Sequence, residues 1–405
     1  MIHQPPAGAR DLLPLEVAQK CWINDRLQEV FQRWGYQRIV TSTLERLDTL
    51  MAGGAIERST VIQLQDSSEG TLGLRPELTA SIARAAVTRM EGNTYPQRLC
   101  YRANVFRNPP AGHHGRQLEF YQAGVELLFA EGVLADAEIL LLLADCLNKL
   151  GLQQWQLILG EAGLTRSLLG SFPESLRERI RYCIAHLDRV ALENLPLSPE
   201  LLERALLLFD LRGKPADVLQ KLASLDLDES GQKIVSNLKS LIELLNDSSS
   251  EPLPLILDLS LLQTFDYYTG IVFDAISCQG GQLGILGQGG RYDQLLGLYH
   301  PLGKHSPGIG FSLNIEDLYA CLVSTSGIPQ ETLYSSDWLV VPQTPQAEPA
   351  AFVYAQKLRN SQHLVRVEIE LGGRSPEQIR EYARSCRINR LAWVKADGTP
   401  VIETL

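Results

Sequence analysis

A long helical block in the middle of the chain constrains the fold more than any other feature. Residues 164–246 carry apolar side chains at helical spacing, and Ser198-Pro199-Glu200 and Lys214-Pro215 are typical of helix starts. β-type patterns precede this block and return after the linker-like stretch DSSSEPLP. We therefore predict an α+β domain over residues 1–325, with an antiparallel sheet core and a helical insertion at about residues 164–250.

The part before this block predicts how the sheet begins. Two β-like runs, residues 99–106 and 118–125, flank a loop rich in Gly, Pro and His, which is typical of an antiparallel hairpin with a long tip. An amphipathic helix is expected over residues 16–34. We expect Val17 and Cys21 to extend the apolar face of this helix.

The last part of the chain, residues 335–405, predicts a small α/β domain. Strand, helix, strand, helix and strand patterns follow one another there. Nine Lys and Arg residues stand against eight Asp and Glu residues in this stretch, a net charge of +1. A domain that grips RNA carries a clearer basic excess. We interpret Arg380, Arg384, Arg387 and Arg390, at helical spacing, as a solvated helix face.

Charge and cysteine usage exclude several classes of protein. The chain of 405 residues has 37 Lys and Arg against 47 Asp and Glu, a net charge of −10, which does not suit a protein whose main task is gripping nucleic acid. Its seven cysteines are scattered without a CxxC pair, as in a cytosolic protein with reduced thiols. No signal peptide and no membrane span is recognisable. We expect a cytoplasmic protein without a metal, and His113 and His114 in a solvated loop.

Two short motifs need a structural context before they can be interpreted. In Leu74-Arg-Pro-Glu-Leu-Thr-Ala80, a strand end would point Glu77 and Thr79 to one face, whereas a solvated edge would hold an Arg75–Glu77 pair. Both readings are open from the fragment alone. The glycine-rich stretch Gly287–Asp293 lacks the order of a phosphate-binding loop, and tight turns between strands are expected there.

Taken together, six ordered motifs resemble the catalytic core of histidyl-tRNA synthetases, which are class II aminoacyl-tRNA synthetases. They are Leu74–Ala80, Phe106-Arg107, Gly115-Arg116, Glu119–Glu126, Asp266-Tyr-Tyr268 and Gly289–Asp293. The opening Pro6–Pro14 looks like the same family's N-terminal signature, and the tail is similar to a truncated anticodon-binding domain. The resemblance implies the class II antiparallel sheet with flanking helices, and a self-dimer.

The resemblance also implies a pocket for free histidine. The family holds the ammonium and the imidazole with two carboxylates, a Gln and a Tyr pair, and charge-assisted hydrogen bonds of this kind are strong. Matched position by position, the histidine-binding residues expected here are Glu77, Thr79, Arg107, Gln122, Glu126, Tyr267 and Tyr268.

The half of the site that would handle ATP departs from the family pattern. The motif 2 glutamate is replaced by Pro109, an arginine that supports activation by Gln263, and the motif 3 arginine by Asp317. Because adenylate formation concentrates negative charge on a phosphate, the loss of two cationic groups is severe. We therefore expect no catalytic residues and no cofactor, and tRNA is not an expected partner.

The sequence keeps the residues expected to bind histidine but lacks residues expected to handle ATP. In this combination it resembles a paralogous family whose members are catalytically inactive. Its members associate with a short-form ATP phosphoribosyltransferase catalytic subunit in histidine biosynthesis, where they are thought to support activity and histidine feedback. The sequence therefore predicts a regulatory subunit with L-histidine as its ligand. Two alternatives are a divergent histidyl-tRNA synthetase, which Pro109, Gln263 and Asp317 speak against, and a scaffold without ligand, which the two retained carboxylates speak against.

Overall fold

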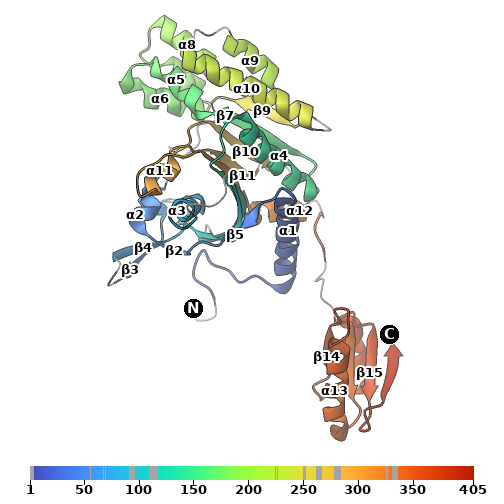
Figure 1. Cartoon of the computed structure of the whole chain (residues 1–405). Coiled ribbons are helices and arrows are strands. Elements are labelled where there is room, and N and C mark those ends of the chain that lie inside the picture. The colour runs from blue at the N-terminus through green and yellow to red at the C-terminus, as the bar shows by residue number, and fades with distance from the viewer. Residues whose placement is uncertain are drawn as a thin grey trace. The chain divides into compact units, whose positions relative to one another are not determined.

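The chain forms two units, Met1–Ile328 and Pro329–Leu405, in a computed structural model (Figure 1). The structure describes residues 4–54, 56–66, 68, 70–90, 96–108, 117–223, 225, 227–249, 252–260, 267–277, 284–324, 327–330 and 336–405. Each unit is described by itself below.

The first unit is built on one large, mainly antiparallel sheet. Its strands lie in the spatial order β1 (Gln37–Arg38), β5 (Gln97–Phe106), β6 (Glu119–Leu128), β12 (Gly308–Asn314), β11 (Gly284–Arg291), β10 (Ile271–Ser277), β7 (Trp155–Glu161), β9 (Leu255–Asp258) and β8 (Arg212–Gly213). The pairs β1–β5 and β7–β9 are parallel, and the other neighbours are antiparallel. The predicted hairpin is confirmed as β5–β6, in register from Gln97–Leu128 to Phe106–Glu119.

Two apolar clusters cover the two faces of this sheet. One contains residues of α1 (Pro14–Arg33), α4 (Val133–Lys149) and α12 (Ile315–Ser324), and the other contains residues of α3 (Thr79–Arg89) and α11 (Leu295–Tyr299). Neighbouring residues of a strand point to opposite faces, and accordingly Cys100 belongs to the first cluster and Tyr101 to the second. The second face carries the candidate site described below.

The first unit also contains a small, separate antiparallel sheet. It consists of β2 (Leu44–Arg46), β4 (Gly70–Leu74) and β3 (Gln63–Asp66), next to α2 (Leu47–Met51) and the 3-10 helix η1 (Arg58–Thr60).

The helical insertion is confirmed and lies at the end of the large sheet formed by β7, β9 and β8 (Figure 1). Its helices are α5 (Ala162–Gly170), α6 (Glu174–Ala185), α7 (Arg189–Glu193), α8 (Pro199–Phe209), α9 (Pro215–Ala223) and α10 (Glu229–Ser248). The predicted start at Ser198 is confirmed, because the Ser198 hydroxyl accepts a hydrogen bond from the Leu201 amide. α4 is apolar on most sides because it is packed between the sheet and α10.

One expectation about α1 is wrong. Val17 is 42% exposed and Cys21 is also exposed, so neither extends the apolar face. The buried side instead takes Asn24, whose amide donates to the Lys20 carbonyl at 2.8 Å. Burial of a polar side chain is tolerated when such a bond is made.

The second unit is a small α/β domain whose strands lie in the order β14 (Val367–Ile369), β13 (Trp338–Pro342), β15 (Arg390–Val394) and β16 (Pro400–Thr404). The η3 turn (Pro345–Ala347), α13 (Glu348–Arg359) and α14 (Pro376–Ser385) complete it. β14, β13 and β15 are parallel, whereas β16 returns antiparallel to β15. β16 was not predicted, although the Asp397-Gly398 pair before it is a hairpin signal.

The arginines of this unit do not form a simple solvated face. Arg380 donates to Glu403 at 2.6 Å, and Arg390 lies over the Trp338 ring. These contacts fasten α14 and β15 to their neighbours, which spacing along a single helix does not reveal.

Candidate ligand site

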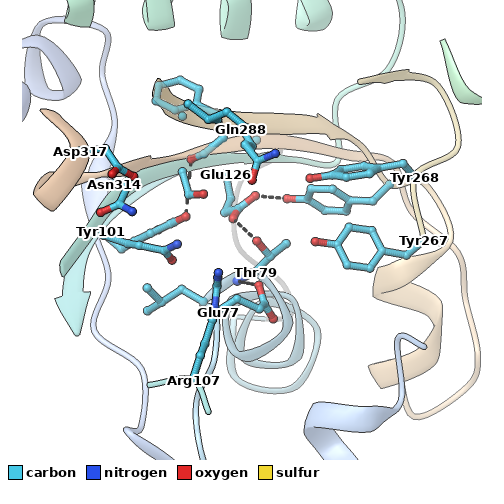
Figure 2. A pocket seen from close by; sticks show the side chains of 18 residues that line it. Glu77, Thr79, Tyr101, Arg107, Glu126, Tyr267, Tyr268, Gln288, Asn314 and Asp317 are labelled. Atoms are coloured by element: carbon cyan, nitrogen blue, oxygen red, sulfur yellow. Dashed lines mark hydrogen bonds between the residues drawn. The ribbon is translucent and has the colours of Figure 1, made fainter. Parts of the chain in front are cut away.

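A cavity of about 160 Å³ lies on the face of the large sheet that α3 and α11 cover (Figure 2). All the residues predicted to bind histidine line it, namely Glu77, Thr79, Arg107, Gln122, Glu126, Tyr267 and Tyr268. Tyr267 and Tyr268 lie on one side of the cavity, and Asn314 and Asp317 lie on the opposite side. Residues from four distant parts of the sequence therefore meet at one place.

Glu77 reaches the cavity by capping a helix. The chain leaves β4 at Leu74 and enters α3 at Thr79, and the Glu77 carboxylate accepts hydrogen bonds from the backbone amides of Thr79 (2.6 Å) and Ala80 (2.9 Å). These amides would otherwise be unpaired at the helix start. The motif is therefore a helix start and not a strand end, but Glu77 and Thr79 do face the same cavity, as the strand-end interpretation predicted.

The alternative of a solvated Arg75–Glu77 pair is also wrong. Arg75 is buried and donates to the backbone carbonyls of Thr41 (2.9 Å), Ser42 (3.1 Å) and Asn104 (2.9 Å). It fixes the loop around the motif, and leaves the carboxylate of Glu77 to the helix and the cavity.

Glu126 is the most deeply buried carboxylate of the site. It is 1% exposed on β6 and accepts hydrogen bonds from the hydroxyls of Thr79 (2.8 Å) and Tyr292. Burial raises the pKa of Glu126 to about 8, against the lowering effect of these two hydrogen bonds. At neutral pH Glu126 therefore favours the protonated form, whereas an ordinary glutamate is ionised.

The approach of Glu126 to β12 depends on glycine. A Cβ atom at Gly310 would collide with the Glu126 carboxylate and with the Val125 carbonyl. Gly310 pairs with Glu126 in the β12–β6 register, so the carboxylate occupies the space that a side chain would take. Sequence reasoning missed Gly310 and Tyr292, because both act through a strand pairing that no local pattern shows.

Arg107 is the only basic side chain among the described residues that line the cavity. Its Nε donates to the Pro76 carbonyl at 2.7 Å, and burial lowers its pKa while the neighbouring Glu77 opposes that shift. Burial likewise raises the pKa of Glu77, and its backbone hydrogen bonds and Arg107 work in the other direction. The carboxyl group of Glu77 and the guanidinium group of Arg107 are thus neighbours in the cavity.

The wall opposite the two tyrosines carries Asn314 and Asp317 (Figure 2), and Gln288 and Ser312 also line the cavity. Gln288 donates to Asp274 at 3.0 Å, and the Asn314 side chain accepts from the Glu316 amide at 3.1 Å. Asp317 is an exposed residue, but partial burial of its carboxyl group and the neighbouring Glu316 raise its pKa. This wall offers amide groups and a carboxyl group.

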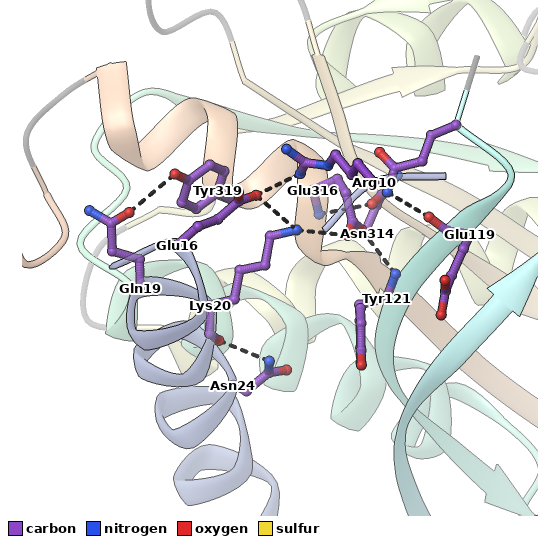
Figure 3. A network of polar contacts seen from close by, with 11 residues as sticks. Arg10, Glu16, Gln19, Lys20, Asn24, Glu119, Tyr121, Asn314, Glu316 and Tyr319 are labelled. Carbon is purple, nitrogen blue, oxygen red and sulfur yellow. Dashed lines mark hydrogen bonds and ion pairs between the residues drawn. The ribbon is translucent and has the colours of Figure 1, made fainter. Parts of the chain in front are cut away.

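A network of polar contacts holds this wall in place from behind (Figure 3). Lys20 is 5% exposed on α1, and its Nζ lies 3.0 Å from Glu316 and 3.4 Å from Glu16. Glu316 also accepts from the Tyr121 amide at 3.0 Å. The junction of β12 and α12, which places Asn314 and Asp317 at the cavity, is therefore tied to both α1 and β6.

Several residues of the sequence argument lie outside the described part of the chain. These are Pro109, His113, His114, Arg116, Gln263 and Asp266. Of the three departures from the synthetase pattern, only Asp317 is placed by the structure.

Two general features of the described residues bear on the class of site. No group of three or more His, Cys, Asp or Glu side chains within the described ranges is placed to hold a metal ion. In the same part of the chain, no helix is both long enough and apolar enough to cross a membrane.

Comparison with curated proteins identifies the relatives of the chain. The ATP phosphoribosyltransferase regulatory subunit of Gloeothece citriformis is 72% identical, and that of Rippkaea orientalis is 68% identical, each over the whole of both chains. The chain belongs to the family of ATP phosphoribosyltransferase regulatory subunits. The sequence model of the histidyl-tRNA synthetase family also matches this regulatory-subunit chain, over residues 8–318.

Solved structures agree with this assignment. A protein of Bacillus halodurans described as an ATP phosphoribosyltransferase regulatory subunit/histidyl-tRNA synthetase has a TM-score of 0.80 at 28% identity, covering 94% of this chain and 97% of the other. A histidyl-tRNA synthetase of a Nostoc species has a TM-score of 0.79 at 20% identity, covering 99% and 96%. The second likeness shows the fold alone. The predicted class II synthetase-like fold of this regulatory-subunit family member is thereby confirmed.

Proposed function

We propose that this chain is a non-catalytic subunit that binds free histidine in the cavity around Glu77 and Glu126, and so regulates a separate ATP phosphoribosyltransferase chain. The observation that carries the proposal is the charge pattern of one cavity. Two buried carboxylates and Arg107 form one part of its lining, and Asp317 stands on the opposite wall. This pattern suits an amino acid better than a nucleotide.

Free histidine matches the polar groups of the cavity one by one. Glu77 is suited to the ammonium group and the neighbouring Arg107 to the α-carboxylate, because both are charge-assisted pairs. Glu126, deeper and held by two hydroxyls, is suited to an imidazole N–H. Gln122 and the two tyrosines supply further polar contacts around the ligand.

The same cavity is poorly equipped to activate histidine with ATP. Attack on the α-phosphate builds up negative charge, and loss of one preorganised stabilising group costs about 10²–10³ in rate. Arg107 is the only basic group among the described lining residues, and Asp317 adds a negative charge. We expect histidine-dependent ATP–pyrophosphate exchange to be absent in the purified protein, and exchange at a synthetase-like rate would contradict this part of the proposal.

The partner follows from the names of the relatives. The curated relatives are named regulatory subunits of ATP phosphoribosyltransferase, and we propose that this chain assembles with a short-form catalytic subunit in the cytosol. The described cysteines are free, which suits a reducing compartment. Co-purification of the two chains tests this assembly, and failure of the chains to associate at micromolar concentration would contradict it.

We also propose that the chain forms a self-dimer and does not use tRNA. Leu13, just before α1, and Val17 and Cys21 on α1 are exposed and offer an apolar surface of the kind that a second copy covers. Light scattering of the isolated chain measures this association, and a strictly monomeric mass would exclude it.

Calorimetry of histidine binding tests the ligand directly. Glu126→Ala should weaken binding by about 1.5–3 kcal/mol, the range for a hydrogen bond to a charged group. Glu178→Ala, which removes a carboxylate that is 79% exposed on α6, is the matched control and should bind as wild type does. Equal affinities of wild type and Glu126→Ala would place histidine elsewhere.

A further inference from the structure

The segment Tyr267–Gly270 is a thin wall between the candidate pocket and the helical insertion. On one side, Tyr267 and Tyr268 line the pocket. On the other side, the Tyr268 carbonyl accepts a hydrogen bond from Nη2 of Arg166 at 3.0 Å, and the Gly270 carbonyl accepts one from the Ala162 amide at 2.9 Å. Both donors belong to α5, the first helix of the insertion.

The same segment is held from its other edge by the end of β11. The Thr269 amide donates to the Arg291 carbonyl at 2.7 Å, and the Thr269 hydroxyl lies 3.1 Å from the Asp293 carboxylate. Tyr292, between these two residues, donates to Glu126 in the pocket. The pocket wall is therefore clamped between α5 and a stretch that itself carries a pocket residue.

A second cavity lies between this wall and α10 of the insertion. This cavity, of about 240 Å³, is lined by Thr269, Gly270 and Arg291 from the wall and by Asn237 and Leu241 from α10, among others. Empty or water-filled space provides fewer packing contacts than a close-packed core. On this side the wall is separated from α10 by the cavity, so its direct contacts with the insertion include the hydrogen bonds from α5, next to the pairing of β10 with β7.

Among the groups that hold the wall, the Arg166 side chain can be substituted without removing a buried side chain. Its side chain is exposed to solvent, whereas the residue whose carbonyl it holds, Tyr268, is 7% exposed. The other donor, the Ala162 amide, belongs to the backbone and cannot be removed by an ordinary substitution.

We propose that Arg166 is a positioning residue of the histidine pocket and couples histidine binding to the position of the helical insertion. This inference rests on the proposed function, that histidine occupies the pocket. Coupling between two sites is reciprocal, so a ligand that fixes Tyr267 and Tyr268 must also fix α5, and release of α5 must weaken the ligand. Histidine binding in the pocket would thereby change the position of the helical insertion, which lies at the surface of the unit.

Two measurements on the full-length chain test the coupling. The first is histidine affinity by calorimetry for wild type, Arg166→Ala and Arg166→Lys. Arg166→Ala should bind histidine about 3- to 10-fold more weakly, as expected for one hydrogen bond of ordinary net strength, and Arg166→Lys should recover part of the loss. Arg181→Ala, in which an exposed arginine of α6 paired with Glu178 is removed, is the matched control and should bind as wild type does.

The second measurement is amide hydrogen exchange of wild type with and without saturating histidine. Histidine should slow exchange in α5, and this slowing should be lost in Arg166→Ala and kept in Arg181→Ala. Because the wild-type comparison needs no variant, it stands even if Arg166→Ala folds poorly.

The outcomes separate this inference from the proposed function. If wild type binds histidine but α5 exchanges at the same rate with and without it, or if Arg166→Ala binds with wild-type affinity, the coupling is refuted and the ligand assignment survives. If wild type binds no histidine, the proposed function fails, and the coupling fails with it.

Discussion

At the residue scale, Glu126 is the group whose surroundings differ most from those of an ordinary glutamate. It accepts hydrogen bonds from two hydroxyls, the causes that shift its pKa include no basic side chain of the described residues, and it is almost wholly buried. A buried carboxylate without a cation favours its neutral form. The pocket therefore contains a carboxyl group that can pass its proton to a basic ligand.

Because Glu126 is buried, its titration is expected to make the stability of the protein depend on pH. The pKa of Glu126 rises from an ordinary 4.5 to about 8, so between these values the native state holds a proton that the unfolded chain has released. Stability must then fall as pH rises through this window, by up to about 1.4 kcal/mol per pH unit. Glu126→Gln lacks the titrating group, and its stability relative to wild type should increase from pH 5 to pH 8. Urea denaturation at several pH values measures this difference, and a difference independent of pH would contradict the assignment.

At the element scale, β12 is the strand that makes room for this carboxylate. Gly310 lies opposite Glu126, and a methyl group there would collide with the carboxylate and with the neighbouring backbone. The site therefore depends on strand register as much as on the identity of its ligand-binding residues.

Gly310→Ala should damage both the fold and the pocket. Overpacking of a core typically costs about 1–3 kcal/mol, and here the displaced group is the carboxylate proposed to bind the imidazole, so histidine binding should be lost as well. Gly284→Ala on β11, where a new Cβ would meet no atom within 4 Å, is the control and should change stability by less than about 0.5 kcal/mol. Wild-type histidine affinity in Gly310→Ala would show that the carboxylate is not part of the binding site.

The elements themselves were largely predictable from the sequence, and their contacts were not. Periodicity and capping residues located the β5–β6 hairpin, α1 and the helices of the insertion, because these signals are local. Glu77 could not be recognised as a helix cap, since it stands two residues before Thr79 with Leu78 between them. Tyr292 and Gly310 join the site only through the pairing of β11, β12 and β6, which is a long-range property.

At the scale of the whole molecule, every described residue of the candidate site belongs to the unit Met1–Ile328. The likeness to synthetases predicts which residues bind the ligand, and Asp317 stands where the synthetase pattern has an arginine. In the proposed function, histidine binds to this chain, and phosphoribosyl transfer takes place on a separate catalytic chain. Feedback between two chains is a coupling free energy, typically about 1–3 kcal/mol.

The measurement that tests this separation most directly is histidine inhibition of the reconstituted complex. The catalytic subunit is assayed with wild type, Glu77→Ala, Glu126→Ala and the control Glu178→Ala, after size-exclusion chromatography has shown that each pair assembles. The account predicts that both pocket variants assemble and support turnover, but lose sensitivity to histidine, whereas Glu178→Ala is inhibited as wild type is. If the pocket variants assemble and histidine inhibits them as strongly as wild type, this chain is not the histidine sensor.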